Sequence, residues 1–274
     1  MFEIMIIPFC SIVVLTLILI YLGIHIIERQ VIFVDLALAQ IAAFGAMTGL
    51  LFGAHLHSLS SYSLSLVFTL AGAVIFALTR LKGRLVPQEA VIGIVYVVAT
   101  AASIILLNSS PSEAEHIKHM LVGNILFVQW HDVLRLAIIC GIVGIFHIAF
   151  RDRFMKISAD PEKASEDGIK VRWWDFLFYA SLGIVVTSAV EIAGVLLIFS
   201  YLVVPAACAM LLTASLRGQM MIGWAIGIAT SVIGLFFSAT FDLPTGAAII
   251  CTFGIFFTIV IVSMAAKRSH GQKG

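Results

Sequence analysis

Nine apolar segments, each about as long as a lipid bilayer is thick, dominate this sequence of 274 residues. A helix that crosses the hydrocarbon core needs about 20 apolar residues, and its backbone polar groups must be paired within the segment. The sequence therefore predicts an all-α, polytopic integral membrane protein of about nine transmembrane helices, or eight if the sixth and seventh segments merge around Glu191. The predicted segments lie at about 5–27, 31–53, 61–79, 90–108, 131–150, 175–190, 192–214, 219–239 and 245–266.

The distribution of basic residues predicts the orientation of these helices. If the segments near 28–30, 80–89, 151–174, 215–218 and 267–274 face the cytoplasm, they hold all but two of the 16 Lys and Arg residues. Such an excess is typical of cytoplasmic segments. We therefore expect the N-terminus outside, the C-terminus inside, and residues 1–274 to form a single transmembrane domain.

Composition and motifs exclude several classes of function. Hydrophobic residues make up 61% of the chain and the net charge is only +1, so nothing suggests nucleic-acid binding. The sequence contains no GxxxxGK[ST], HExxH or GxSxG motif. We therefore expect a chain that binds no cofactor, performs no covalent chemistry and cannot hydrolyse ATP by itself.

The polar stretch between the fifth and sixth segments carries the signals of a short cytoplasmic helix. Asp160 is a favourable N-cap, Pro161 suits the first helical position, and Glu162 lies in the first turn. Gly168 supplies a stop. A helix of about two turns is too short to be stable alone, so either the membrane body or a partner must hold it.

The few polar groups predicted at membrane depth are Asp35, Gln40 and Glu191, together with hydroxyls such as those of Ser200 and Tyr201. An uncompensated acid in hydrocarbon costs about 2.5–3.5 kcal/mol, and such residues commonly mark substrate pathways. Gln40 follows Gln30 by ten residues, which places it about 15 Å deep, near the midplane. Structural hydrogen bonding, or a position nearer the membrane interface, is the alternative explanation for the two acids.

Histidines predicted on the outer side form a second candidate metal site. Their alternative interpretation is an ordinary solvated loop. His116 and His119 would share a helical face, as would Glu115 and His119.

Glycine pairs at 45/49 and 223/227 have the spacing that permits close approach of membrane helices.

Six stretches, in order, resemble the permease subunits of ATP-binding-cassette importers for zinc, manganese and iron. They are "ERQVIFVDLALAQIAAFG", "PQEAVIGIVYVVATA", "LVGNILFVQWHDV", "SADPEKASEDGIKV", "AVEIAGVLLIFSYLVVPAACAMLLT" and "FDLPTGAAII". The resemblance implies a homodimer of permeases in the plasma (inner) membrane of a prokaryote. It also implies two cytoplasmic ATPase subunits and an extracytoplasmic metal-binding protein that docks near Asn124 and Asp242. The short helix would be the coupling helix near 158–170, with Asp160, Pro161, Glu162, Ala164 and Gly168 contacting the ATPase.

The predicted metal path departs from the family pattern G-D-x-L-[SA]-H. Gln40 takes the His position, Leu36 the Asp position, and Asp35 the Gly position. Asp35 and Gln40 point about 140° apart on a helix, so they cannot share one face. Three explanations stay open: Glu191 replaces the lost acid opposite Gln40, the path is poorer in ligands, or the substrate is not a bare metal ion. Asp35 is then expected to hydrogen-bond a neighbouring helix.

Two other functions compete with an importer permease. A proton-coupled secondary transporter would use Asp35 or Glu191 as the proton carrier, but no internal repeat of the kind common in such transporters is evident. A non-transport membrane scaffold would need no buried acids.

Overall fold

The computed structural model describes residues 2–53, 58–80, 86–107 and 125–271. This part of the chain contains nine helices long and apolar enough to cross a membrane. The number nine is confirmed, because the sixth and seventh spans are separate helices joined by Gly194 alone. The nine are α1 (Phe2–Glu28), α2 (Val34–Leu51), α3 (Leu59–Thr79), α4 (Gln88–Leu107), α6 (Trp130–Ala149), α9 (Val171–Ala193), α10 (Val195–Leu212), α11 (Leu216–Phe241) and α12 (Thr245–Gly271). Three shorter elements are η2 (Ile125–Phe127), α7 (Arg151–Ala159) and α8 (Pro161–Glu166).

The helices form one bundle in which α2 and α9 are the most buried spans and α4 is the least. One large apolar core joins residues from α1, α2, α3, α9 and α10. Large hydrophobic side chains are nevertheless exposed along α4, α6 and α12. Such surfaces are expected where lipid or another subunit covers a helix.

Glycines let several helix pairs approach closely. A Cβ at Gly45 would lie 2.9 Å from a carbonyl oxygen of α3, and Cβ atoms at Gly223 and Gly227 would lie within 3.0 Å of side chains of α1. A Cβ at Gly23 would collide with the carbonyl oxygen of Leu202 in α10. The predicted close approaches at residues 45, 223 and 227 are therefore confirmed, and Gly23 adds a tighter one.

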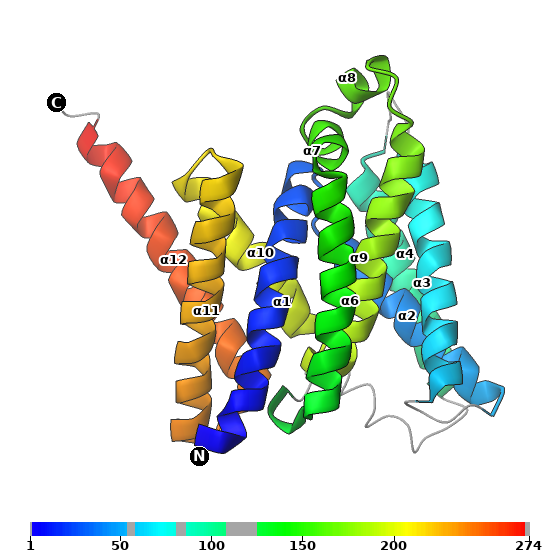
Figure 1. The fold of residues 1–274 in the computed structure, drawn as a ribbon, viewed down its shortest axis with the longest axis horizontal. Helices are drawn as coiled ribbons and strands as arrows, with labels where there is room; N and C mark the ends of the chain where they lie inside the picture. Colours follow the sequence, from blue (N-terminus) through cyan, green and yellow to red (C-terminus); the bar gives the residue numbers. More distant parts are fainter. Residues whose placement is uncertain (1, 54–57, 81–85, 108–124, 272–274) are drawn as a thin grey trace.

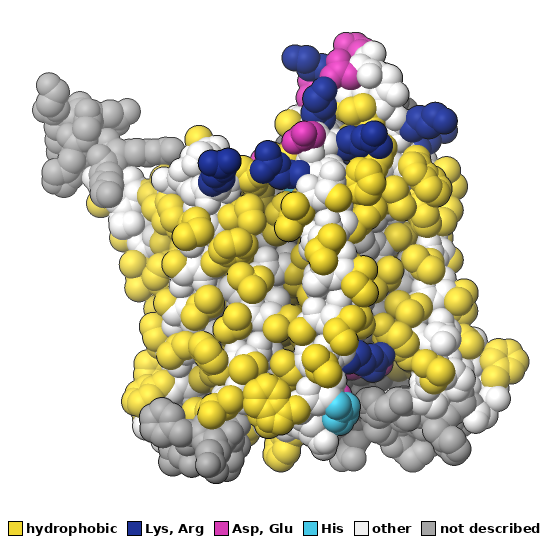
Figure 2. All heavy atoms as spheres, in the orientation of Figure 1, with side chains coloured by type: hydrophobic (Ala, Val, Ile, Leu, Met, Phe, Trp, Pro, Cys, Tyr) yellow, Lys and Arg dark blue, Asp and Glu magenta, His cyan; other side chains and the backbone are white. Residues whose placement is uncertain are grey.

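The two faces of the bundle differ in charge. Helices α7 and α8 lie on the face where α12 ends, whereas α1 begins on the opposite face (Figure 1). In the view of Figure 2, most Lys and Arg side chains gather over α7, α8 and the neighbouring helix ends, above a band of hydrophobic side chains. The excess of basic residues assigns this face to the cytoplasm, in agreement with the predicted orientation.

Candidate functional site

The short helix α8 begins as the sequence predicts. The Oδ1 atom of Asp160 accepts hydrogen bonds from the backbone N–H groups of Glu162 and Lys163, each at 3.0 Å. Pro161 occupies the first turn, where its missing N–H removes no helical hydrogen bond. An N-cap of this kind stabilises a helix by about 1 kcal/mol.

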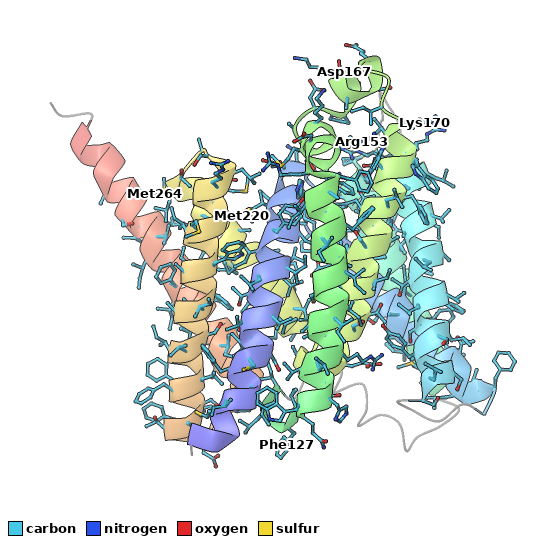
Figure 3. All side chains as sticks on the ribbon, viewed as in Figure 1. Phe127, Arg153, Asp167, Lys170, Met220 and Met264 are labelled. Atoms are coloured by element: carbon cyan, nitrogen blue, oxygen red, sulfur yellow. The ribbon has the colours of Figure 1, made fainter. Side chains whose placement is uncertain are left out.

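The end of α8 also follows the prediction. Gly168 adopts a positive φ of 80°, and the N–H of Ile169 bonds the carbonyl of Ala164 at 3.1 Å, as in a Schellman motif. Ala164 is buried, whereas Glu162 and Asp167 are exposed. The helix therefore stands out from the membrane body, with Asp167 near its tip (Figure 3).

Helix α7, which the sequence analysis did not predict, anchors α8 to the bundle. Phe154, Ile157 and Ser158 form its buried face. Phe154 stacks on His147 of α6 with ring centroids 4.3 Å apart, and it meets Trp174 of α9 edge-on at 5.4 Å. The spacing i, i+3, i+4 of the three buried residues is typical of an amphipathic helix. The charged residues that surround them in the sequence make this pattern hard to recognise.

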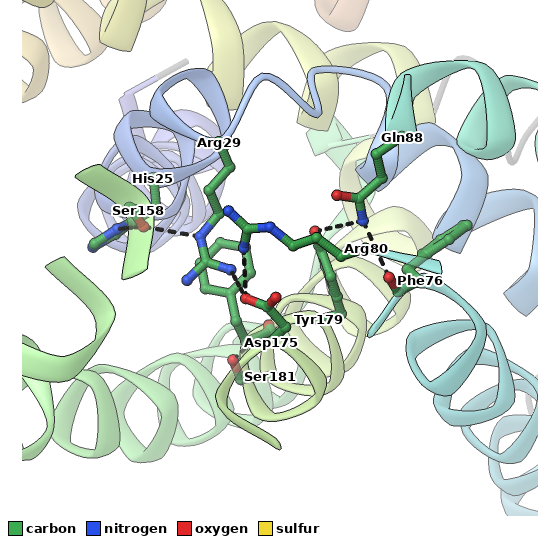
Figure 4. A network of polar contacts seen from close by, with 10 residues as sticks. His25, Arg29, Phe76, Arg80, Gln88, Ser158, Asp175, Tyr179 and Ser181 are labelled. Carbon is green, nitrogen blue, oxygen red and sulfur yellow. Dashed lines mark hydrogen bonds and ion pairs between the residues drawn. The ribbon is translucent and has the colours of Figure 1, made fainter. Parts of the chain in front are cut away.

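A buried polar network lies beneath α7 (Figure 4). The Nη1 atom of Arg29 donates to Asp175 Oδ1 at 2.7 Å, and Arg80 Nη1 donates to the same oxygen at 2.7 Å. Arg29 Nε also donates to Ser158 Oγ at 2.8 Å, and that hydroxyl bonds His25 Nδ1 at 2.8 Å. The side chains of Arg29 and Asp175 are 0% exposed and that of Arg80 is 15% exposed.

The electrostatics of this network are unbalanced. Two guanidinium groups share one carboxylate, and Arg29 Nη2 and Asp175 Oδ2 have no hydrogen-bond partner among the described residues. Burial lowers the pKa of Arg29, while the Asp175 carboxylate acts against that shift. The Arg29 guanidinium also lies 4.0 Å from the centroid of the Phe178 ring, which stabilises a cation.

The network extends to two further helices. Gln88 Nε2 donates to the Tyr179 hydroxyl and to the carbonyl of Phe76, each at 3.1 Å. Helices α1, α3, α4, α7 and α9 are thus joined at the cytoplasmic face. In the sequence, Arg29 and Arg80 indicate only the orientation of the helices, because partners 146 and 95 positions away leave no local pattern.

Glu191 lies near the outer end of α9, at a cavity of about 320 Å³. Its Oε2 pairs with Arg135 Nη1 at 3.4 Å, and these side chains are 30% and 46% exposed. The Arg135 guanidinium lies 4.1 Å from the centroid of the Tyr62 ring, and the Tyr62 hydroxyl bonds Ser188 at 2.8 Å. We call this cavity, which also has His131 and Asp132 in its lining, the outer vestibule.

Gln40 and Asp35 lie on α2, well inside the bundle. Gln40 is 9% exposed and Asp35 is fully enclosed in the first turn of the helix. The expected hydrogen bond to a neighbouring helix is not seen at Asp35 Oδ1, which has no partner in the described part of the chain. Glu89 of α4 accepts a hydrogen bond from the Phe33 N–H, just before the start of α2, at 3.0 Å.

The depths of Gln40 and Glu191 differ. Gln40 is six residues from the start of α2, or about 9 Å, and Glu191 is 20 residues from the start of α9, or about 30 Å. Their roles as metal ligands, like that of Asp35, stay predictions. Among the described residues, no group of three or more His, Cys, Asp and Glu side chains is placed to hold a metal ion. The outer candidates Glu115, His116 and His119, together with Asn124, lie outside the described residues.

Comparisons with known proteins agree on one family. The model of the family described as "ABC 3 transport family" matches residues 1–265. The chain is 32% identical over 195 residues to the manganese transport system membrane protein MntC of Listeria innocua, covering 71% of this chain and 69% of the relative. It is 32% identical over 207 residues to the manganese import system permease protein ScaB of Streptococcus gordonii, covering 73% of each. A solved structure described as PsaBC from Streptococcus pneumoniae in complex with Fab matches with a TM-score of 0.77 at 25% identity, covering 93% of this chain and 89% of that one.

Proposed function

The chain belongs to the ABC 3 transport family, and from this membership we propose that it is the permease subunit of an ATP-driven importer of divalent metal ions. It resides as a multi-pass protein in the plasma membrane of a prokaryote. The observation that carries the proposal is α8, a capped helix on the cytoplasmic face that exposes Glu162, Lys163 and Glu166. A separate ATPase subunit is its proposed partner.

The proposed ATPase contact uses the exposed side of α8. The ends of the helix are fixed by Asp160, Pro161 and Gly168. Ala164 packs against the rest of the chain, whereas Glu162 is exposed. A six-residue helix buries too little to hold itself in place, so a groove on an ATPase would complete its packing. This arrangement gives a reason for both the strong cap and the exposed surface.

Two further partners complete the proposed assembly. A second copy of the permease would form the other wall of a central path, and an extracytoplasmic metal-binding protein would deliver the ion. The outer vestibule has two acids, Glu191 and Asp132, and one arginine, Arg135, in its lining, so it carries a small net negative charge on the side where such a protein would dock. Acidic side chains at an entrance raise the local concentration of cations.

We propose that the metal ion meets Glu191, Gln40 and Asp35 at successive depths rather than in one shared site. The separation of Gln40 and Glu191 along the membrane favours this order. All three side chains offer oxygen atoms, which suit Mn²⁺ better than Zn²⁺. Among zinc, manganese and iron, Mn²⁺ is therefore the proposed substrate. Glu89, which bonds the backbone N–H of Phe33 just before α2, would join the inner end of the path.

The proposed mechanism is alternating access driven from the cytoplasmic face. ATP binding would close the ATPase subunits and draw the two α8 helices together. Because α7 is bonded to α1 and α9 through Ser158, Arg29 and Asp175, a displacement of α8 reaches the transmembrane helices through buried contacts. The permease performs no covalent step in this scheme.

Reconstitution with the partner ATPase in proteoliposomes tests the proposal. We expect ATP-dependent uptake of Mn²⁺ that Glu191→Gln reduces, and a relative gain for Zn²⁺ in Gln40→His, because imidazole is the better zinc ligand. Gln219→His is the matched control, since Gln219 is also a buried glutamine but lies at the start of α11. Its metal preference should equal that of the wild type.

Three results would count against the proposal. Uptake that needs a proton gradient but no ATPase would favour a secondary transporter. ATPase association that survives deletion of residues 158–170 would remove α8 as the coupling helix. ATP-dependent transport without any of the three metals would point to a non-metal substrate.

A further inference from the structure

A second cavity, of about 460 Å³, opens between α1, α6 and α11 on the flank of the bundle. Its lining is apolar over most of its length, and Arg151 and Arg217 stand at one end. Arg151 begins α7 and Arg217 lies in the first turn of α11, so both arginines are at the cytoplasmic edge of the membrane. We call this cavity the flank groove. It lies apart from Gln40, Asp35 and the outer vestibule.

The floor of the flank groove is made by two glycines of α6. A Cβ at Gly141 would meet no atom within 4 Å, and one at Gly144 would only touch Ile18 at 3.9 Å. Neither glycine is therefore required by a close helix contact. Glycine in a helix is about 1 kcal/mol less favourable than alanine. The two glycines therefore destabilise α6 slightly, and their lack of side chains leaves the groove open.

Near its cytoplasmic end, the groove is lined by two side chains whose buried polar atoms find no hydrogen-bond partner among the described residues. They are the Tyr21 hydroxyl and the Nδ1 atom of His147, whose Nε2 already bonds Ser181 at 2.8 Å. Unpaired buried polar atoms are rare and call for a ligand or water. Their order along the groove is distinctive, with two cations at the membrane edge, polar atoms next, and an apolar trough beyond.

We propose that the flank groove binds one anionic phospholipid of the inner leaflet. Its phosphate would lie between Arg151 and Arg217, its ester groups near Tyr21 and His147, and an acyl chain along Gly141. Gly141 is ten residues from Arg151, which is about 15 Å, the depth of one leaflet. Basic pockets between transmembrane helices on the cytoplasmic side suit anionic lipid head groups. The charge and the apolar depth favour a lipid over a second copy of the chain.

Lipid binding to the delipidated full-length protein in neutral detergent tests the proposal by native mass spectrometry. The probes are phosphatidylglycerol and phosphatidylcholine with identical acyl chains, and inorganic phosphate. We expect a preference for phosphatidylglycerol that Arg151→Gln and Arg217→Gln each weaken about fivefold and together about 30-fold. Arg172→Gln, which removes an exposed arginine at the cytoplasmic start of α9, is the control and should leave the preference unchanged.

A second pair of variants separates the groove from its charges. Gly141→Leu should fill the trough and abolish tight binding of phosphatidylglycerol, whereas Gly141→Ala should retain it and show that the site tolerates the loss of glycine. The proposal is overturned by equal binding of the two lipids, or by an unchanged preference in the double arginine variant. It is also overturned if inorganic phosphate competes as well as the lipid, or if Gly141→Leu changes the oligomeric state instead of lipid binding.

Discussion

Replacing Asp175 with Asn removes the one negative charge that faces two arginines at the cytoplasmic face. Arg29 and Asp175 are both 0% exposed, so the guanidinium of Arg29 would become a buried cation without a counter-charge. Breaking a buried pair in this way costs about 3–5 kcal/mol. For a chain of this size each kcal/mol lowers the melting temperature by about 2–4 °C, so we expect a decrease of about 6 to 20 °C.

Arg80→Gln supplies the matched control. It also removes a hydrogen bond to Asp175, but Arg29 keeps its partner and the repulsion between two guanidinium groups is relieved. Its expected cost is below about 1 kcal/mol, since Arg80 is partly exposed. The double variant Arg29→Met with Asp175→Asn should be more stable than Asp175→Asn alone, because the unpaired cation is gone.

Thermal unfolding in lipid nanodiscs measures the stability, and reconstituted uptake measures coupling. Asp175→Asn should retain ATP hydrolysis by the partner subunit while metal uptake per ATP falls, since α7 loses its bonded path to α9. A melting temperature within 2 °C of the wild type would refute the reasoning about the buried charge. So would an Arg80→Gln variant that loses as much stability as Asp175→Asn.

Four other substitutions have outcomes set by local geometry. Gly23→Ala should lower the melting temperature strongly, because its Cβ meets the backbone carbonyl of Leu202; Gly141→Ala in open space should raise it slightly. Asp160→Ala should cost about 1 kcal/mol of helix stability and weaken ATPase association in a pull-down titration. An unchanged affinity would show that α8 does not contribute to ATPase binding. Tyr201→Phe should cost about 1 kcal/mol in thermal unfolding, since it removes a buried hydrogen bond to a hydroxyl of α11; no loss would mean that water satisfies the partner.

The membrane architecture was predictable because each span carries its own signal. A run of about 20 apolar residues needs no knowledge of its neighbours, and the boundaries of α3 and α6 agree with the predicted 61–79 and 131–150 within two residues. The start and stop of α8 were predictable for the same reason, since Asp160 and Gly168 act on the backbone beside them.

The polar network was not predictable because its partners are distant in sequence. Arg29, Arg80 and Asp175 sit at the ends of three different spans, where a charged residue is ordinary. Only the packing of α1, α3 and α9 brings them together. The surroundings of Glu191 were not predictable for the same reason, because they depend on Arg135 of a neighbouring helix.

Gly194 turns the chain from α9 into α10 within a single residue, at a φ of 78° and a ψ of 156° that essentially only glycine adopts. A connection this short has no slack, so the outer end of α9 cannot tilt without dragging α10 along. The two helices are therefore expected to move as one rigid unit with its bend at the outer surface. A displacement of the cytoplasmic end of α9 would therefore reach the outer side of the membrane and return through α10 to α1, which packs closely against α10 at Gly23.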